Sequence, residues 1–424
     1  MKRSTVALAL SAAFAATPGM AQTSMEQKLQ ILQQEIDELR AQIQQVRTQK
    51  QQQAPASAVP AAAGDASDLT SGLASGATTL WGYGEMNYNR FRDADRSSKA
   101  DLRRFVFGFG HRFNDRLTFN SEVEIEHAVS SATDKGEAEI EQAYLNYKFS
   151  DKLNVKAGLF LIPLGILNET HEPTTYFGVE RNEVETRIIP TTWRELGFGV
   201  HGLVGEGLKY DIGVTTGFDA GKLDDPSAGI RSAHQEGQLA NAHDLSVYGA
   251  LNYRRPGLLI GGGAFTGNTG QNGQTNPLLK GVAARLTLWD VHAKYSVGRL
   301  DLQGLYAAGR IGDADRLNAA FLASSPAPFA APKALKGWYT QAAYHVFKQG
   351  DFDLAPFVRY ERYQIRQQED VANGLLQDPK NLERVTTLGL NFRLHSQVVL
   401  KTDVQTYATD KTKNRFNVGV GYLF

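Results

Sequence analysis

Charged residues recur at alternate positions in many segments whose remaining positions are apolar. Alternate residues of a strand point to opposite faces, so these charges would share one face of a sheet. The basic residues expected on that face are Arg104, Arg112, Lys148, Lys156, Lys209, Arg285, Arg359, Arg393, Lys401 and Arg415. The acidic residues expected there are Glu122, Glu124, Glu126, Asp211, Glu361 and Asp403. Rings of Arg or Lys select anions, and Arg binds phosphate with two parallel hydrogen bonds. The carboxylates leave the ion preference open, since these charges could also serve only to keep the face wet.

Other kinds of chemistry have little support in the residue pattern. The nine His residues show no grouping with Ser that would suggest a hydrolase, so no enzyme activity is expected. The pairs Asp93/Asp95 and Asp313/Asp315 lack the ligand spacing of a dedicated calcium loop, so neither a metal nor a cofactor is expected. Lys plus Arg and Asp plus Glu each number 45, and this neutral balance gives no electrostatic support for a nucleic-acid partner.

The last eleven residues, 414–424, show the clearest strand pattern. Phe416, Val418, Val420, Tyr422 and Phe424 occupy every second position, and the positions from Asn417 to Gly421 between them are small or polar. Such a strand suits a transmembrane barrel, whose apolar face contacts lipid and whose polar face contacts a wet lumen. The mean hydropathy is −0.34, and no apolar run of about 18 residues follows residue 21, so a helical membrane protein is excluded. The strand also resembles the C-terminal signal of bacterial outer-membrane barrels, which ends in Phe.

The period-two pattern predicts an all-β transmembrane barrel of about sixteen antiparallel strands. The expected strands are 80–91, 103–113, 116–129, 137–149, 152–161, 195–204, 207–218, 243–254, 257–266, 280–296, 299–310, 336–347, 351–363, 384–394, 397–408 and 414–424. Tight connections alternate with longer ones along this series. Short turns of such barrels face the periplasm and long loops face outward, so an even strand number leaves both barrel ends in the periplasm.

The N-terminal part reads as three further segments. Lys2 and Arg3 precede an apolar run that ends near small residues, so residues 1–21 are expected to be a signal peptide. Seven apolar residues spaced by four and three between Met25 and Val46 predict a short α-helical coiled coil over 22–48, although a lone amphipathic helix is an alternative. Residues 49–79 have the composition of a flexible linker, and 80–424 form the expected barrel. These segments predict an outer-membrane protein of a Gram-negative bacterium with its coiled coil in the periplasm.

The long connection 162–194 is the candidate for a constriction. A sixteen-stranded barrel encloses an aqueous channel, which must be narrowed if it is to choose between solutes. The segment is long and carries Glu180, Arg181 and Arg187, which are expected to lie at the narrowest point together with Arg104 and Lys156. An external flap is the alternative.

The chain resembles the phosphate-selective porin O/P family over about 80–424. The resemblance rests on Gly158, Pro163 and Gly165, on the pair Glu180-Arg181, on the segment 197–202, and on a late segment, 356–361, that reads Pro-Phe-Val-Arg-Tyr-Glu. It implies a trimeric, sixteen-stranded channel whose third outer loop folds into the lumen. The expected function is a passive outer-membrane porin for small hydrophilic solutes, with a preference for anions or phosphate left open. The alternative is a structural or adhesive barrel that is tethered through its periplasmic coiled coil.

Overall fold

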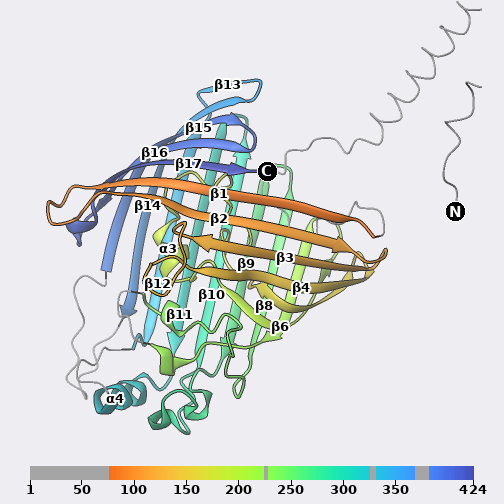
Figure 1. The fold of residues 1–424 in the computed structure, drawn as a ribbon, viewed down its shortest axis with the longest axis vertical. Helices are drawn as coiled ribbons and strands as arrows, with labels where there is room; N and C mark the ends of the chain where they lie inside the picture. Colours follow the sequence, from red (N-terminus) through yellow and green to blue (C-terminus); the bar gives the residue numbers. More distant parts are fainter. Residues whose placement is uncertain (1–75, 224–227, 325–330, 368–381) are drawn as a thin grey trace, which may run out of the picture. The chain divides into compact units, whose positions relative to one another are not determined.

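The computed structural model describes residues 76–223, 228–324, 331–367 and 382–424. The expected signal peptide, the coiled coil and the linker up to residue 75 lie outside the described residues. The last linker positions belong to the barrel, because the first strand begins at Thr78. All described strands form one antiparallel sheet that closes on itself (Figure 1).

The strands follow one another around the barrel in sequence order. They are β1 (Thr78–Phe91), β2 (Lys99–Arg112), β3 (Leu117–Glu126), β4 (Ala138–Ser150), β5 (Leu153–Leu161), β6 (Arg194–Leu203), β7 (Leu208–Thr215), β8 (Ser246–Arg255), β9 (Leu258–Gly267), β10 (Leu286–Val297), β11 (Leu300–Ile311), β12 (Ala334–Tyr344), β13 (Phe347–Gln349), β14 (Phe352–Gln367), β15 (Leu382–His395), β16 (Val398–Tyr407) and β17 (Arg415–Leu423).

The wall of the barrel contains sixteen strands. The described sheet has seventeen, but β13 has three residues and pairs with β14 beyond the point where β12 ends its own pairing with β14. It is therefore an extension of the hairpin between β12 and β14. Pairing of β1 with both β2 and β17 closes the barrel, so the prediction of about sixteen antiparallel strands is confirmed.

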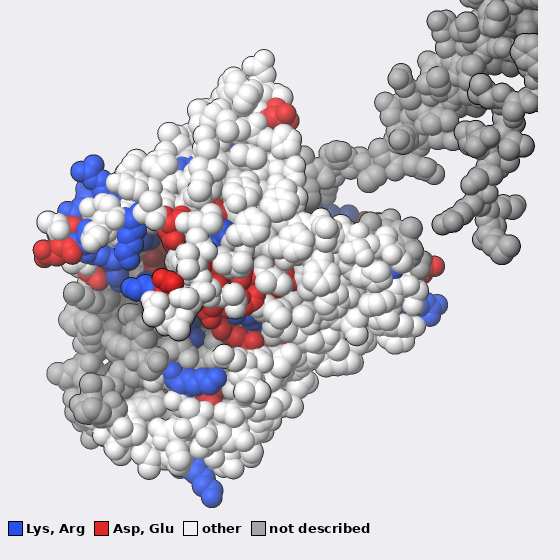
Figure 2. Space-filling view, viewed as in Figure 1, with Lys and Arg blue, Asp and Glu red and all other residues white. Residues whose placement is uncertain are grey.

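The alternating sequence pattern separates an outer apolar face from an inner polar face. In β2, Phe105 and Phe107 are exposed on the outside, whereas Arg104 is 5% exposed. In β17, Phe416 and Val418 are exposed while Asn417 is fully buried. Figure 2 shows charged side chains gathered around a hollow and at the ends of the barrel, with wide white areas of wall between them. This distribution is the one expected of a lipid-facing wall around a wet interior.

The two ends of the barrel differ in the length of their connections. At one end, here called the turn end, hairpins turn within a few residues, and glycines such as Gly257 (φ 73°) and Gly298 (φ 60°) supply the left-handed conformation. At the other end, the loop end, the connections are longer. Their helices are α3 (Glu183–Arg187), α4 (Ala314–Ser324), η1 (Ala220–Lys222), η2 (Arg231–Ala233), η3 (Gln271–Gly273), η4 (Pro277–Leu279) and η7 (Lys411–Lys413). None of the helices in the described ranges is both long enough and apolar enough to span a bilayer.

The chain terminus takes part in closing the barrel. The backbone N–H of Phe424 donates to Gly82 (2.8 Å), and that of Gly82 donates to Phe424 (2.9 Å). The Phe424 ring is 54% exposed on the outer face, beside Phe105 and Tyr422. The aromatic ring therefore lies at the seam between the last strand and the first.

Replacing Phe424 by aspartate is expected to lower the yield of folded barrel in the outer membrane. A charge at the interface costs only about 0–1 kcal/mol on the lipid face, so a large loss would come from failed recognition during assembly. The yield of heat-modifiable protein on gels measures the effect. Phe416→Asp, on the same strand and face, is the comparison, and wild-type yields for Phe424→Asp would contradict the expectation.

Candidate functional site

Residues 162–193, here called loop 3, connect β5 to β6 and fold into the interior of the barrel. Carboxylates of the inner wall accept hydrogen bonds from the backbone of the loop. Val179 N–H donates to Asp403 of β16 (2.7 Å), and Glu183 N–H donates to Glu361 of β14 (2.6 Å). Since these acceptors lie on inward faces of distant strands, loop 3 crosses the lumen and is not an external flap.

One side of loop 3 is apolar and packs against part of the inner wall. Its Ile162, Leu164, Val184, Ile188, Ile189 and Trp193 are buried in one cluster with Phe265, Leu286, Leu288, Leu305 and Leu335 of the wall. The inner face is thus apolar at the loop ends of β9 to β12, where a purely wet lumen would have polar residues. Burial of this apolar surface fixes the loop to one half of the barrel.

Glu185 of α3 organises the loop itself. Its carboxylate is fully buried and accepts hydrogen bonds from the backbone N–H groups of Ile166 (2.5 Å) and Leu167 (2.7 Å). It also accepts from the side chains of Asn182 (2.8 Å) and Tyr339 of β12 (2.8 Å). One side chain therefore joins the start of the loop, its helix and the barrel wall.

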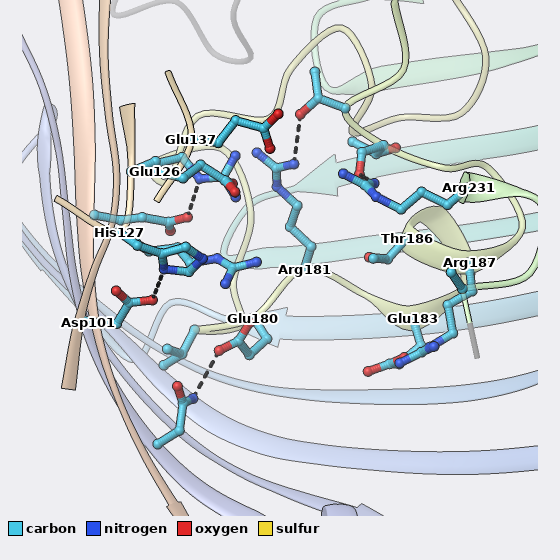
Figure 3. Close-up of a pocket in the computed structure, with 18 of the residues that line it drawn as sticks. Asp101, Glu126, His127, Glu137, Glu180, Arg181, Glu183, Thr186, Arg187 and Arg231 are labelled. Atoms are coloured by element: carbon cyan, nitrogen blue, oxygen red, sulfur yellow. Dashed lines mark hydrogen bonds and ion pairs between the residues drawn. The ribbon is translucent and has the colours of Figure 1, made fainter. Parts of the chain in front are cut away.

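The polar side of loop 3 borders a cavity of about 900 Å³. The opposite side of this cavity is formed by the loop-end halves of β1 to β4, and further lining comes from the start of β17 and from residues 228–236. Figure 3 shows Arg187 and Arg231 on one side of this space, Asp101, Glu126 and His127 on the other, and Arg181 between them. Most of the residues that line this cavity are charged or polar.

Three cationic groups of the cavity are held by neutral oxygens. Arg181 donates to Thr192 Oγ1 (2.9 Å) and to the carbonyl of His171 (3.3 Å). Within the described residues, Arg231 donates to the carbonyls of Pro190 and Thr191, and Arg415 donates to Gln405 (2.6 Å). Neutral acceptors position a guanidinium without cancelling its charge.

Most carboxylates of the cavity, by contrast, have a basic partner. Arg104 forms ion pairs with Glu85 (2.8 Å), Glu124 (3.2 Å) and Glu126 (3.7 Å). Glu183 pairs with Arg187; burial alone would raise the Glu183 pKa, but Arg187 and Arg415 lower it to about 2. Arg104 and Arg187 are the nearest basic partners of these carboxylates, and Glu183 also interacts with Arg415.

His234 and Glu236 form a pair of titratable groups where residues 228–236 meet loop 3. Burial lowers the pKa of His234 to about 4, so this imidazole is neutral near pH 7. Burial would raise the pKa of Glu236, but the nearby His234 ring (3.5 Å) and the charge of Arg194 lower it to about 2. Glu236 is therefore ionised and lies 3.5 Å from Arg194, which also pairs with Glu139. Arg194 is thus shared by two carboxylates, and Arg231 adds a further positive charge that acts on Glu236.

Comparison with known sequences identifies the chain. Residues 76–417 match the family described as phosphate-selective porin O and P, which is most of the chain. The chain belongs to this porin family. It is a non-enzymatic channel of the outer membrane, as the alternating strands and the resemblance predicted. The turn end of the porin faces the periplasm, since short turns of such barrels lie on that side.

Individual relatives agree with this assignment. A protein of Aquifex aeolicus (strain VF5), described as uncharacterized, is 31% identical over 358 residues, which make up 82% of this chain and 80% of that protein. OmpF of Salmonella typhi, solved in complex with daunomycin, is 16% identical with a TM-score of 0.54 over 82% of this chain and 98% of its own. An anion-selective porin from Comamonas acidovorans is 13% identical with a TM-score of 0.51 over 82% of this chain and 99% of its own. The two solved structures show that the fold is shared.

The structure brings together only part of the residue set that was expected to line the pore or its constriction. Arg104, Glu180, Arg181 and Arg187 line the cavity, and Glu180 accepts a hydrogen bond from Asn89 (2.9 Å). The other five expected residues, Lys148, Lys156, Lys209, Arg359 and Arg393, are not among the residues that line it.

Those five residues have other partners or places. Arg359 is 2.8 Å from Glu361, and Arg393 donates to the carbonyl of Thr174 in loop 3 (2.8 Å). Lys156 is buried in an ion pair with Asp211 (2.6 Å), so it does not face Arg181 across the cavity. Lys148 and Lys209 lie near the turn ends of β4 and β7, where Lys148 pairs with Asp151.

Sequence reasoning missed Arg231 as a cavity residue. It lies in the connection between β7 and β8, and this connection folds over loop 3 and places Arg231 beside Thr191. The only signal was the length of the connection, 216–245, which exceeds what a simple return to the next strand requires.

Proposed function

We propose that this porin conducts small anions in preference to cations, and that the polar side of loop 3 sets the preference. The supporting observation is the unequal pairing of charges around the cavity. Arg181, Arg231 and Arg415 are held by neutral oxygens, whereas Glu85, Glu124, Glu126 and Glu183 share Arg104 or Arg187. The residues that line the cavity include ten Lys or Arg and nine Asp or Glu, so the lining carries a small excess of positive charge.

The expected class of solute follows from the basic side chains of the cavity, which are mainly arginines. Guanidinium groups present a planar fork of donors that fits the two oxygens of a phosphate or a carboxylate, whereas chloride gains only their charge. Small oxyanions, inorganic phosphate among them, should therefore dwell longer in the cavity than chloride. The buried glutamates of β3 and β4 limit this preference, since they oppose the entry of any anion close to that part of the wall.

Planar-bilayer recordings of the purified porin test the proposal. In a KCl gradient the reversal potential should have the sign of chloride selectivity, and added inorganic phosphate should reduce the chloride current at millimolar concentration or below. A reversal potential of the opposite sign would overturn the anion preference. Chloride selectivity without any block by phosphate would leave a general anion channel with no oxyanion preference.

We also propose that the porin is a homotrimer in the outer membrane and that residues 22–48 form a coiled coil in the periplasm. Support for the trimer comes from the family resemblance, and support for the helix comes from the four-three spacing between Met25 and Val46. The apparent mass of the unheated protein, with and without residues 22–48, tests both statements. A strictly monomeric full-length chain would contradict the trimer.

A further inference from the structure

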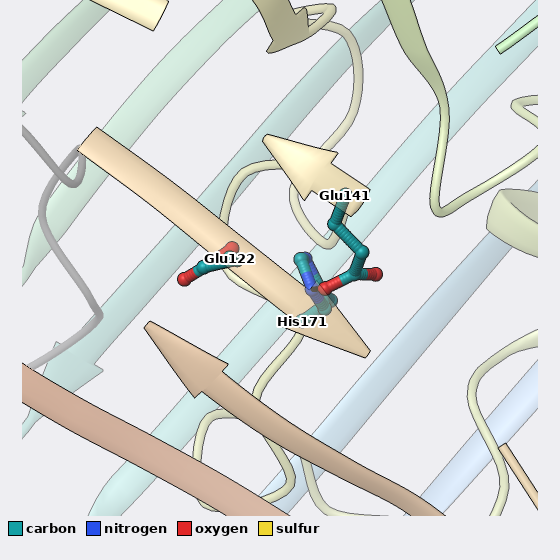
Figure 4. Close-up of side chains that lie close together, drawn as sticks. All are labelled: Glu122, Glu141 and His171. Carbon is teal, nitrogen blue, oxygen red and sulfur yellow. Dashed lines mark hydrogen bonds and ion pairs between the residues drawn. The ribbon is translucent and has the colours of Figure 1, made fainter. Parts of the chain in front are cut away.

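Three potential metal ligands lie close together between loop 3 and the strands β3 and β4, next to the cavity. Glu122 of β3, Glu141 of β4 and His171 of loop 3 are all buried, and each offers one ligand atom within 4.8 Å of the others (Figure 4). Glu141 belongs also to a second group with Glu124 and Glu139 that meets the same distance limit. The chain has no Cys, so any metal site in it must use oxygen and imidazole ligands.

The hydrogen bonds of His171 leave one ring nitrogen directed at this group. Its Nδ1 lies 3.1 Å from the carbonyl oxygen of Asn168, which can only accept, so Nδ1 carries a proton. Its Nε2 lies 2.7 Å from Tyr83 Oη and 3.4 Å from Glu141 Oε2. Metal-binding histidines commonly donate their second N–H to a backbone carbonyl in this way, which fixes the ring and the tautomer.

The acceptors at this point outnumber the donors. Tyr83 Oη can donate one proton, either to His171 Nε2 or to Glu141 Oε2, which lies 3.1 Å away. The other oxygen of Glu141, Oε1, is buried and has no hydrogen-bond partner among the described residues. A fully buried carboxylate oxygen without a donor costs free energy unless a proton or a cation supplies the missing positive charge.

Nearby ion pairs do not supply that charge. Arg104 is already shared by Glu85, Glu124 and Glu126, and Arg194 is shared by Glu139 and Glu236. Glu122 accepts only from the neutral donors Trp81 Nε1 (3.1 Å) and Gln142 Nε2 (2.7 Å). Each of its oxygens retains a second lone pair for a metal ion.

We propose that Glu122, Glu141 and His171 bind one divalent transition-metal cation, of which Zn²⁺ and Mn²⁺ are the probes. Two carboxylates with one imidazole favour these ions over Ca²⁺, which prefers an all-oxygen shell. A cation can reach the group from the cavity, because Glu124 and Glu139 line the cavity and are grouped with Glu141.

The bound cation would connect loop 3 to β3 and β4 through metal–ligand bonds. His171 belongs to the loop, whereas Glu122 and Glu141 belong to β3 and β4. The anchors of the loop backbone lie on β10, β14, β15 and β16, where Asp290, Glu361, Arg393 and Asp403 form hydrogen bonds with it. The metal is therefore expected to hold the cavity at a fixed width without itself lying in the solute path.

Metal titration of the intact, folded porin tests this site. The purified porin is first treated with EDTA, which is then removed. Titration calorimetry in detergent with ZnCl₂ or MnCl₂ should then show binding of one metal ion per chain. His171→Gln and Glu141→Gln should each weaken binding at least about tenfold to a hundredfold. The matched controls are His243→Gln, an exposed loop histidine, and Asp211→Asn, a buried lumen carboxylate at another place, and both should bind as the wild type does.

Heat-modifiability on gels shows whether each variant is folded. The titration of the wild-type porin tests the proposal even if a variant fails to fold. Absence of a stoichiometric site in the wild-type porin would overturn the proposal and leave His171 doubly protonated, in an ion pair with Glu141. Equal binding by wild type and His171→Gln would also overturn it, because the metal would then be bound elsewhere. Neither result depends on whether the channel prefers anions.

Discussion

Glu185→Ala is expected to release loop 3 and to raise the single-channel conductance. The substitution leaves two backbone N–H groups, the Asn182 amide and the Tyr339 hydroxyl without their shared acceptor. Hydrogen bonds to a charged group contribute about 1.5–3 kcal/mol each, so the loop should lose about 5 kcal/mol or more of stabilisation. The barrel itself should remain closed, because its strand pairing does not involve this residue.

Two measurements separate loop release from general unfolding. Bilayer recordings should show larger and noisier openings, and trypsin should cut after Arg181 or Arg187 in the variant while the wild-type loop resists. Glu206→Ala is the matched control, because Glu206 is an exposed turn residue paired with Arg255. Wild-type conductance and trypsin resistance in Glu185→Ala would show that the apolar contacts alone hold the loop.

Arg181→Gln combined with Arg187→Gln is expected to shift the reversal potential towards cation selectivity. The first substitution removes a charge held by neutral oxygens, and the second leaves the Glu183 carboxylate without its main counter-charge. A unit charge about 8 Å from an ion, in a medium between water and protein, contributes about 1 kcal/mol, or about a fivefold change in the permeability ratio per charge. The shift should be larger at 0.01 M than at 1 M salt, because the Debye length falls from about 30 Å to about 3 Å.

Charges at other places provide the comparison for this pair. Lys280→Gln, an exposed residue in the connection between β9 and β10, should change the reversal potential little. Arg231→Gln should shift it in the same direction as the pair, since Arg231 lines the same cavity. If the pair and Lys280→Gln gave equal small shifts, the cavity would not be the selective part of the channel.

The barrel wall was predictable because each strand carries its own pattern. In β15, Leu388 and Leu390 are exposed on the outside and Asn391 is buried within, as their alternation predicts. Lipid and water impose opposite demands on the two faces, so a strand can be recognised without knowledge of its neighbours. The strand count and the alternation of short and long connections follow from that local information.

The interior was less predictable because its residues have partners that are distant in sequence. Leu286 and Leu288 point inward although a wet lumen should have polar residues there, and they do so because loop 3 covers them. The alternation in the strand shows that both side chains point inward, but it does not show which segment packs on them. Charge pairing has the same limit: inward Lys156 is buried by Asp211, whereas Arg181 keeps an uncompensated charge, and only the three-dimensional contacts distinguish them.

The anchoring of loop 3 has a consequence for the order of assembly. The loop depends on Tyr83 of β1 through His171 and on Asp403 of β16 through Val179, which is 224 residues away in sequence. These two strands come into place around the loop only when β17 has paired with β1. Seating of the loop must therefore be a late event, and a barrel stalled before its seam closes would have a wide and unselective opening. The width of the channel therefore shows whether β17 has paired with β1.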